Sequence, residues 1–310
     1  MRAVFLGTPD FAVPSLNALC GSAEVVAVVC QPDRERDRKG KVIEGAVKKR
    51  AAELGIPIYQ FEKIRRDGVE TLRSLAPDIM ITCAYGQILS QEILDIAPLG
   101  VLNVHGSILP RYRGSAPIQR ALINGEKETG VTIMKTDIGM DTGAILAIEK
   151  LPIADDDYVG DVYDKLSVIG AELLVKTLAG YVKGEIKPVP QCDAFATVAP
   201  PLKKEEAYLD FNNSEESVRN IIRGFGYGVC GFRGEQLKIY RADIADNEAN
   251  VKAGTVIKAV KNDFIVACGE GALALTEVQA SGKKRMRTAD FLNGVHVSPG
   301  EKLTKIGGNE

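Results

Sequence analysis

A carboxamide and an imidazole follow an apolar pair in this sequence, and together they suit acyl-transfer chemistry. Asn103 comes directly after Val101-Leu102 and His105 two residues later, and Gly106 and Pro110 follow them. Because side chains alternate along a β-strand, a strand here would point Asn103 and His105 to the same face. Open α/β sheets bind ligands at the carboxyl ends of their strands, so we expect these two groups to reach a ligand site.

A carboxylate that can reach the imidazole occurs in a turn further along the chain. Asp141 lies in the glycine-rich stretch Asp137–Gly143. An amine that attacks an acyl carbon must lose a proton, and the tetrahedral intermediate carries an oxyanion. A carboxamide N–H can stabilise the oxyanion, an imidazole can donate to it or move protons, and a carboxylate can orient the imidazole or relay a proton. The three groups therefore favour acyl transfer to an amine.

Each of these residues also has an ordinary structural interpretation. Histidines after strands are more often structural than catalytic, and Asn103 and Asp141 are common at strand ends and turns. A serine hydrolase using Ser107 is disfavoured, because the chain has no G-x-S-x-G elbow. The first strand-to-helix turn, Gly7–Asp10, lacks the G-x-G-x-x-G of a dinucleotide site, which disfavours a nicotinamide dehydrogenase.

The elements around these residues predict a doubly wound α/β domain with a mostly parallel, Rossmann-like sheet. Short apolar runs suited to strands buried on both faces alternate with segments of helical periodicity. The predicted strands are Val4–Leu6, Val25–Cys30, Ile79–Thr82, Val101–Val104, Val131–Lys135 and Ala144–Ile148. The predicted helices are Phe11–Leu19, Val42–Leu54, Asp67–Leu75, Pro117–Ile123 and Val159–Tyr181.

The composition changes after this first domain, which we place at residues 1–183. Residues 184–204 contain four prolines and little periodicity, and they are predicted to form a linker. Residues 205–310 are predicted to form a small OB-like β-barrel. Its helix is Ser214–Arg223, and its strands are Gln236–Arg241, Gly254–Val260, Phe264–Ala267 and Leu273–Val278.

The composition limits the remaining possibilities. The net charge is −2, so any surface for a nucleic acid must be local. Six cysteines without a C-x-x-C pair and only two histidines predict no disulfide framework, no metal site and a reducing, cytoplasmic location. No stretch is apolar enough to cross a membrane, and the apolar start Met1–Gly7 is predicted to be a strand and not a signal peptide.

The motifs resemble those of the folate-dependent formyltransferases. The resemblance lies in Asn103–Gly114 with Ala116-Pro117, and in Thr129–Thr132 followed by Asp137–Gly143. It implies that Asn103, His105 and Asp141 are catalytic and that 10-formyltetrahydrofolate donates the formyl group. It also implies a folate pocket formed by Tyr85, Gly86, Gln87, Ile88, Leu89, Ser107, Ile108, Leu109, Pro110, Asp137, Ile138 and Gly139.

Members of this family differ in the amine that they formylate. The start Phe5–Ala12, the basic stretch Gln31–Lys41, and the segments Lys203–Glu206 and Gly282–Met286 resemble the members that act on methionyl-tRNA. The resemblance therefore implies initiator methionyl-tRNA as the partner. No apolar surface stripe stands out in the sequence, so we expect a monomer. The implied tRNA contacts are Arg34, Arg36, Arg38, Lys39, Lys41, Lys283, Lys284 and Arg285.

The sequence leaves other interpretations open. They are formyl transfer to a nucleotide-linked amino sugar, hydrolysis of 10-formyltetrahydrofolate, and a folate- or RNA-binding protein without activity. The basic stretch is also typical of an ordinary solvated loop. The chain departs from its family at Gly224–Gly228, where the family typically carries a Pro-Trp-Pro-like turn, and it contains no tryptophan.

Overall fold

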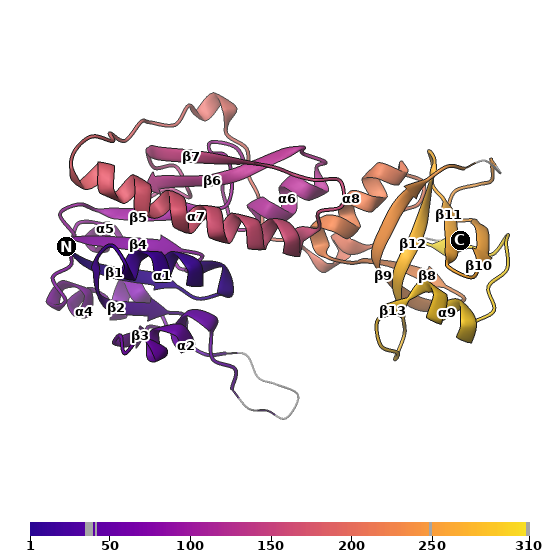
Figure 1. The fold of residues 1–310 in the computed structure, drawn as a ribbon, viewed down its shortest axis with the longest axis horizontal. Coiled ribbons are helices and arrows are strands. Elements are labelled where there is room, and N and C mark those ends of the chain that lie inside the picture. Colours follow the sequence, from indigo (N-terminus) through magenta and orange to yellow (C-terminus); the bar gives the residue numbers. More distant parts are fainter. Residues whose placement is uncertain (35–39, 41, 248–249, 308–310) are drawn as a thin grey trace. The chain divides into compact units, whose positions relative to one another are not determined.

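The structure, a computed structural model, describes residues 1–34, 40, 42–247 and 250–307 (Figure 1). The chain divides into two compact units. The first comprises Met1–Pro117, Glu128–Pro152 and Tyr163–Pro200, and the second comprises Ile118–Lys127, Ile153–Val162 and Pro201–Glu310. The chain therefore passes between the units several times before its last segment begins.

A seven-stranded sheet forms the centre of the first unit, in the order β3-β2-β1-β4-β5-β6-β7 (Figure 1). The strands from β3 to β5 run parallel, and β6 and β7 are antiparallel to their neighbours. The predicted mostly parallel α/β sheet is thus confirmed. The strands are β1 (Arg2–Gly7), β2 (Glu24–Cys30), β3 (Ile58–Gln60), β4 (Ile79–Cys83), β5 (Val101–His105), β6 (Glu128–Lys135) and β7 (Ile145–Pro152).

Helices cover both faces of this sheet, which explains why its central strands are apolar throughout. On one face, α3 (Ile64–Asp67), α4 (Val69–Ser74) and α5 (Gln91–Leu94) share a core with β1, β2, β4 and β5. On the other, α7 (Val159–Val182) packs closely on β5 and β6, since a Cβ at Gly170 would lie 2.9 Å from Val104 Cγ1. The remaining helices of this unit are η1 (Asp10–Ala12), α1 (Val13–Cys20), α2 (Ala46–Glu53) and η2 (Asp193–Phe195).

Several elements of this unit differ from the predicted bounds or were not predicted, and α5 is one of the latter. Helix α2 begins at Ala46, four residues after the predicted start. The predicted helix Asp67–Leu75 is divided at Gly68, where a Cβ would lie 2.8 Å from Ile64 Cγ1. Strand β3 was not predicted, because three residues are too few to show an alternating pattern.

Residues 184–200, which the sequence predicts as part of a linker, pair with the first unit. Val189 exchanges two backbone hydrogen bonds of 2.8 Å with Ile145, and Ala199 N donates to Arg113 O. A stretch rich in proline can therefore lie along a structured surface, although proline lacks the N–H needed for regular pairing.

The second unit is a curled antiparallel sheet in the order β10-β11-β12-β9-β8-β14, with β13 beside β12. The strands are β8 (Gly228–Phe232), β9 (Glu235–Ala245), β10 (Val256–Val260), β11 (Asp263–Ala267), β12 (Ala272–Ala280), β13 (Met286–Arg287) and β14 (Leu303–Thr304). Val256 N donates to Glu301 O at 2.7 Å and Leu303 N donates to Gly254 O at 2.8 Å, so the two edges of the sheet meet. This closure agrees with the predicted small β-barrel.

Helix α8 (Glu215–Phe225) joins the inserted segments to this barrel. The Ser214 side chain accepts from Ser217 N and caps its start, and Gly226, with φ of 77°, ends it. Buried Arg223 donates to the backbone oxygens of Asp157 and Ala154 at 2.8 Å each. These bonds explain why residues 153–162 belong to the second unit. Its other helices are α6 (Pro117–Ile123), η3 (Lys204–Ala207) and α9 (Thr288–Gly294).

Among the residues that the structure describes, no helix has both the length and the apolar character needed to cross a membrane.

Candidate active site

Strand β5 presents the carboxamide and the imidazole as the sequence predicts. Asn103 is half-buried and His105 is buried, and they are separated by one residue of the strand. Asn103 Oδ1 accepts a hydrogen bond of 2.9 Å from the Thr82 hydroxyl on β4. Asn103 Nδ2 makes no hydrogen bond with any residue that the structure describes, and it remains able to donate to a ligand oxygen.

His105 lies between a backbone carbonyl and a carboxylate. Its Nε2 is 3.0 Å from Tyr112 O, and its Nδ1 is 3.6 Å from Asp141 Oδ2. Because a carbonyl only accepts, Nε2 must carry a hydrogen, and the second ring nitrogen faces Asp141. A proton added to Nδ1 would lie beside the carboxylate. The pair is therefore arranged to accept a proton and hold it.

The carboxylate of Asp141 is fixed by a second bond, in which Gly114 N donates to Oδ2 at 2.8 Å. The Asp141 backbone is in the left-handed region, with φ of 53°. In the same turn, Asp137 Oδ1 accepts from Gly139 N at 3.1 Å and from the Thr142 hydroxyl at 2.6 Å. A Cβ at Gly143 would lie 1.7 Å from Lys135 O, so the turn requires glycine there.

The loop after β5 is held by its own hydrogen bonds. The hydroxyl of buried Ser107 donates to Arg111 O at 2.7 Å. Thr132 Oγ1 on β6 donates to Ser107 O at 2.6 Å and accepts from Leu109 N at 3.1 Å. Ser107 and Thr132 thus fix the shape of this loop.

The loop after β4 is braced by a glutamine. Gln87 Oε1 accepts from Ile64 N at 2.8 Å, and its Nε2 donates to Phe61 O at 2.9 Å. Gly86 has φ of +82°, and Tyr85 and Leu89 are buried. Of the implied folate residues in this loop, Gln87, Tyr85 and Leu89 therefore shape it, and Ile88 is the exposed apolar side chain.

Three large apolar side chains are exposed on the loops that the resemblance assigns to folate or that adjoin them. Ile88 is 74% exposed, Ile138 is 64% exposed and Met140 is 59% exposed. Exposed apolar side chains that gather near polar groups are typical of ligand sites. These residues suit the flat face of a heterocycle.

The implied RNA contacts lie on both units. Exposed Arg34 pairs with Glu62 at 2.6 Å. Arg36, Arg38, Lys39 and Lys41 lie outside the described residues. Lys283 and Lys284 are exposed on the β12–β13 turn. Arg285 makes two 2.5 Å bonds with Glu277 and lies 4.4 Å from the ring centroid of Tyr240, so its charge is already neutralised.

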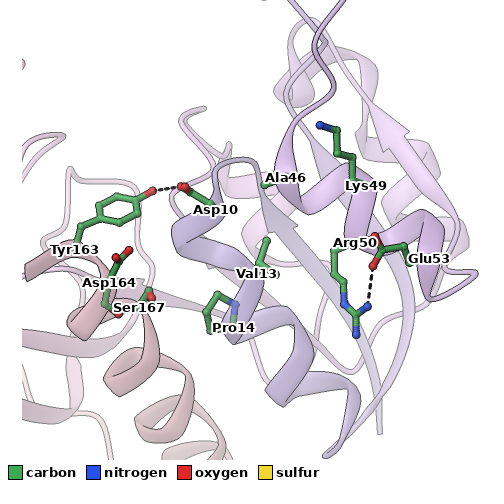
Figure 2. Close-up of a pocket in the computed structure, with 10 residues that line it drawn as sticks. All are labelled: Asp10, Val13, Pro14, Ala46, Lys49, Arg50, Glu53, Tyr163, Asp164 and Ser167. Atoms are coloured by element: carbon green, nitrogen blue, oxygen red, sulfur yellow. Dashed lines mark hydrogen bonds and ion pairs between the residues drawn. The ribbon is translucent and has the colours of Figure 1, made fainter. Parts of the chain in front are cut away.

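A separate hollow of the first unit lies beside α1, α2 and α7 (Figure 2). The Tyr163 hydroxyl donates to Asp10 Oδ1 at 2.6 Å, and Arg50 pairs with Glu53 at 2.8 Å, as Figure 2 shows. None of Asn103, His105 and Asp141 lines it. These four side chains are thus paired with one another.

No three metal-ligating side chains gather anywhere in the described part of the chain. Burial raises the pKa of Cys30, Cys83 and Cys268 to about 12, which keeps these thiols protonated and unreactive near neutral pH.

The sequence reasoning missed four residues that shape the site. They are Thr82, Tyr112, Gly114 and Gln191. Thr82 and Gln191 reach the site through side chains, and Tyr112 and Gly114 reach it through backbone atoms. The residue type does not reveal which backbone atoms make contacts, and Gln191 lies in the segment predicted as a linker. No local pattern could have found them.

Comparisons with known proteins find relatives along most of the chain. Residues 1–178 match the family model "Formyl transferase", and residues 201–296 match "Formyl transferase, C-terminal domain". A protein of Geotalea uraniireducens named methionyl-tRNA formyltransferase is 42% identical over 310 residues, with 98% of each chain covered. One of the same name from Moorella thermoacetica is 44% identical over 308 residues, with 98% of this chain and 99% of the relative covered.

Solved structures support the fold. A Helicobacter canadensis N-formyltransferase, in complex with folinic acid and dTDP-3-aminofucose, has a TM-score of 0.68 at 19% identity. The match covers 89% of this chain and 99% of that one. HypX from Aquifex aeolicus, in complex with tetrahydrofolic acid, has a TM-score of 0.63 at 17% identity. This match covers 94% of this chain and 47% of the HypX chain.

Proposed function

The chain belongs to the formyl transferase family, and we propose that it transfers the formyl group of 10-formyltetrahydrofolate to the amino group of methionine on initiator tRNA. The observation that carries this proposal is the match of methionyl-tRNA formyltransferases along both units at more than 40% identity. The product, formylmethionyl-tRNA, serves translation initiation.

The geometry around His105 supports a direct transfer. The methionyl nitrogen attacks the formyl carbon, and a new C–N bond forms while the carbonyl becomes an oxyanion. Asn103 Nδ2, which has no partner among the described residues, donates to this oxygen. His105 donates to it through Nδ1 once that nitrogen carries a proton, because Nε2 is engaged by Tyr112 O. The attacking nitrogen gives up a proton toward the His105–Asp141 pair, and N10 of the folate takes a proton as its bond to the formyl carbon breaks.

The loops at the carboxyl ends of β4 and β5 and the β6–β7 turn supply the folate pocket in this proposal. Ile88 and Ile138 contact the pterin ring, and the backbone of Ile108–Pro110 and of Asp137–Gly139 meets its polar edge. The exposure of Ile88 and Ile138, at 74% and 64%, supports this role, since solvent otherwise meets these large apolar side chains. The folate acts as a substrate, and no metal is part of the scheme.

The tRNA contacts in this proposal come from the basic stretch at Arg34–Lys41 and from Lys283 and Lys284. Exposed lysines on a turn suit phosphate contacts, because phosphate binding depends on charge more than on precise geometry. Arg285 holds Glu277 in our scheme, and it stabilises the hairpin that carries the two lysines. We further propose that the protein acts as a monomer in the cytoplasm.

The rival activities are formylation of a nucleotide amino sugar and release of formate from 10-formyltetrahydrofolate. The fold resembles that of an N-formyltransferase in complex with dTDP-3-aminofucose, so the test includes a nucleotide amino sugar as an acceptor. Neither rival needs the basic stretch.

The test supplies 10-formyltetrahydrofolate with a labelled formyl group to the pure protein. Methionyl initiator tRNA, methionyl elongator tRNA and a nucleotide amino sugar are offered in separate reactions. We expect label on the methionyl initiator tRNA alone, and loss of that label in Asn103→Ala, His105→Ala and Asp141→Ala. Glu149→Gln, an exposed change on β7, is the matched control and should keep full activity.

Two results would overturn the proposal. Label on the amino sugar would assign the site to another acceptor, and labelled formate in every reaction would assign it to hydrolysis.

A further inference from the structure

We infer that Gln191 is a positioning residue for formyl transfer, because it fixes the turn that carries Asp141 beside His105. The inference rests on the proposed function, in which Asp141 takes part in proton movement. Gln191 lies in the segment before Pro200 and is half-buried. It touches neither His105 nor the Asp141 carboxylate, and it acts through the backbone of the turn.

The side-chain amide of Gln191 holds both ends of the short stretch that contains Asp141. Its Nε2 donates to Asp141 O at 2.8 Å and to Gly143 O at 2.7 Å. A primary amide has two N–H groups, so both are used on this turn. Two carbonyls two residues apart are thereby drawn to one nitrogen, and the backbone between them is fixed.

The orientation of the Gln191 amide is itself determined by Arg113. Arg113 Nε and Nη2 donate to Gln191 Oε1 at 3.0 and 2.8 Å, and Nη2 also reaches Asp193 Oδ1 at 2.7 Å. Arg113 is buried, and a guanidinium has no acceptor. The oxygen of Gln191 must therefore face Arg113, which leaves the NH₂ group facing the Asp141 turn.

The same arginine belongs to the short backbone stretch that contacts both members of the His–Asp pair. Tyr112 O accepts from His105 Nε2, and Gly114 N donates to Asp141 Oδ2. This stretch pairs with the end of the Gln191 segment, since Tyr112 N donates to the Thr197 hydroxyl at 2.9 Å and Arg113 N to Thr197 O at 2.9 Å. Gln191 thus links the Asp141 turn to the same backbone stretch that contacts His105 and Asp141.

The turn needs such a brace because its backbone is strained. Asp141 has φ of 53°, a region that non-glycine residues enter only when the surroundings hold them there. The distance of 3.6 Å between His105 Nδ1 and Asp141 Oδ2 is already longer than a hydrogen bond. A turn released from Gln191 would relax toward ordinary φ values and move the carboxylate away from the ring.

The test compares Gln191→Met, which keeps the length of the side chain but removes both donors, with Cys192→Ala, an exposed change at the next residue. Both are made in a His296→Gln background. The chain contains only two histidines, so His105 then gives the only imidazole ¹⁵N signals. The readouts are these signals as a function of pH, kcat and the KM of each substrate, and the melting temperature.

We expect kcat of Gln191→Met to fall about 100-fold, because small misplacements of catalytic groups have effects of this size. The KM values should stay within about threefold, because Gln191 touches neither substrate in the proposed scheme. The ¹⁵N signals of His105 should shift, since the Asp141 carboxylate is no longer held beside the ring. Cys192→Ala should match its parent in every readout.

Unchanged His105 signals in a folded Gln191→Met protein would overturn the inference, whatever the activity. A fall in kcat that only follows a loss of folded protein, with parental His105 signals in the folded fraction, would overturn it as well. If the parent protein transferred no formyl group but Gln191→Met still shifted the His105 signals, the proposed function would fail and the positioning of Asp141 by Gln191 would stand.

Discussion

His105 Nδ1 lies 3.6 Å from Asp141 Oδ2, although one residue ends β5 and the other lies in the turn between β6 and β7. The carboxylate is held more closely by Gly114 N, at 2.8 Å, than by the imidazole. Hydrogen bonds between catalytic groups are often long before a substrate binds and shorten in the reacting complex. The pair is therefore in place before the reaction but still has room to accept a proton.

Replacing Asp141 by asparagine should lower kcat by about 100-fold or more, the usual effect of removing a general acid–base group. Asparagine keeps the shape and can still accept from Gly114 N, but it cannot stabilise a charged His105. Steady-state kinetics with both substrates measure the change. A fall in affinity for folate with kcat unchanged would show instead that Asp141 acts in binding. Glu149→Gln on β7 is again the control.

Replacing Ile88 by asparagine should raise the folate KM about tenfold and leave the melting temperature unchanged. Ile88 is 74% exposed, so the folded protein loses little by the change, while burial of an isoleucine against a ligand contributes about 1.5 kcal/mol. Ile244→Asn, at a position 51% exposed on β9, is the matched control, and the folate KM of this variant should be unchanged. Equal effects of the two changes would argue against a folate contact at Ile88.

Replacing Glu206 by glutamine should destabilise the second unit in a manner that depends on pH. Hydrogen bonding from Arg120 lowers the pKa of Glu206 from its ordinary value of 4.5 to about 2. A carboxyl with a lowered pKa stabilises the fold fully above its ordinary pKa, and the contribution is lost as the pH falls toward the folded value. Because the side chain is 36% exposed, we expect at most about 1 kcal/mol.

Melting temperatures of wild type and Glu206→Gln between about pH 7 and about pH 2 measure this effect. The difference should be largest at neutral pH and should vanish at the acid end of the range. Glu205→Gln, an exposed neighbour, is the control. A difference that grows as the pH falls would contradict the assigned ion pair.

Replacing Lys283 and Lys284 together by glutamate should raise the tRNA KM about tenfold at low salt and reduce its salt dependence, as expected when phosphate contacts are lost. The folate KM should not change. Lys261→Glu, on the exposed β10–β11 turn of the same unit, reverses a charge at another place and serves as the control. If the control raised the tRNA KM as much, net charge and not a contact at the hairpin would be responsible.

The sequence by itself was sufficient for those elements whose pattern is local. The apolar run before Asn103 predicted β5, and alternation within the strand predicted that Asn103 and His105 share a face. Helix α6 has the predicted bounds, since Pro117 suits its first turn. Likewise, apolar residues on both faces of β1 and β4 predicted a sheet covered by helices. Each of these features depends on neighbours within a few residues.

Only the tertiary structure decided how the catalytic groups are held. Gln191 lies 50 residues from Asp141 and 78 from Arg113, in a stretch with no periodicity, and its role depends on which backbone carbonyls it meets. Tyr112 and Gly114 act through backbone atoms, which every residue has. The sequence determined which groups could do the chemistry, because residue type is written in it. The folding of distant segments onto one another determined how these groups are positioned. Contacts between backbone atoms far apart in the chain cannot be recognised from residue type, because every residue has the same backbone atoms.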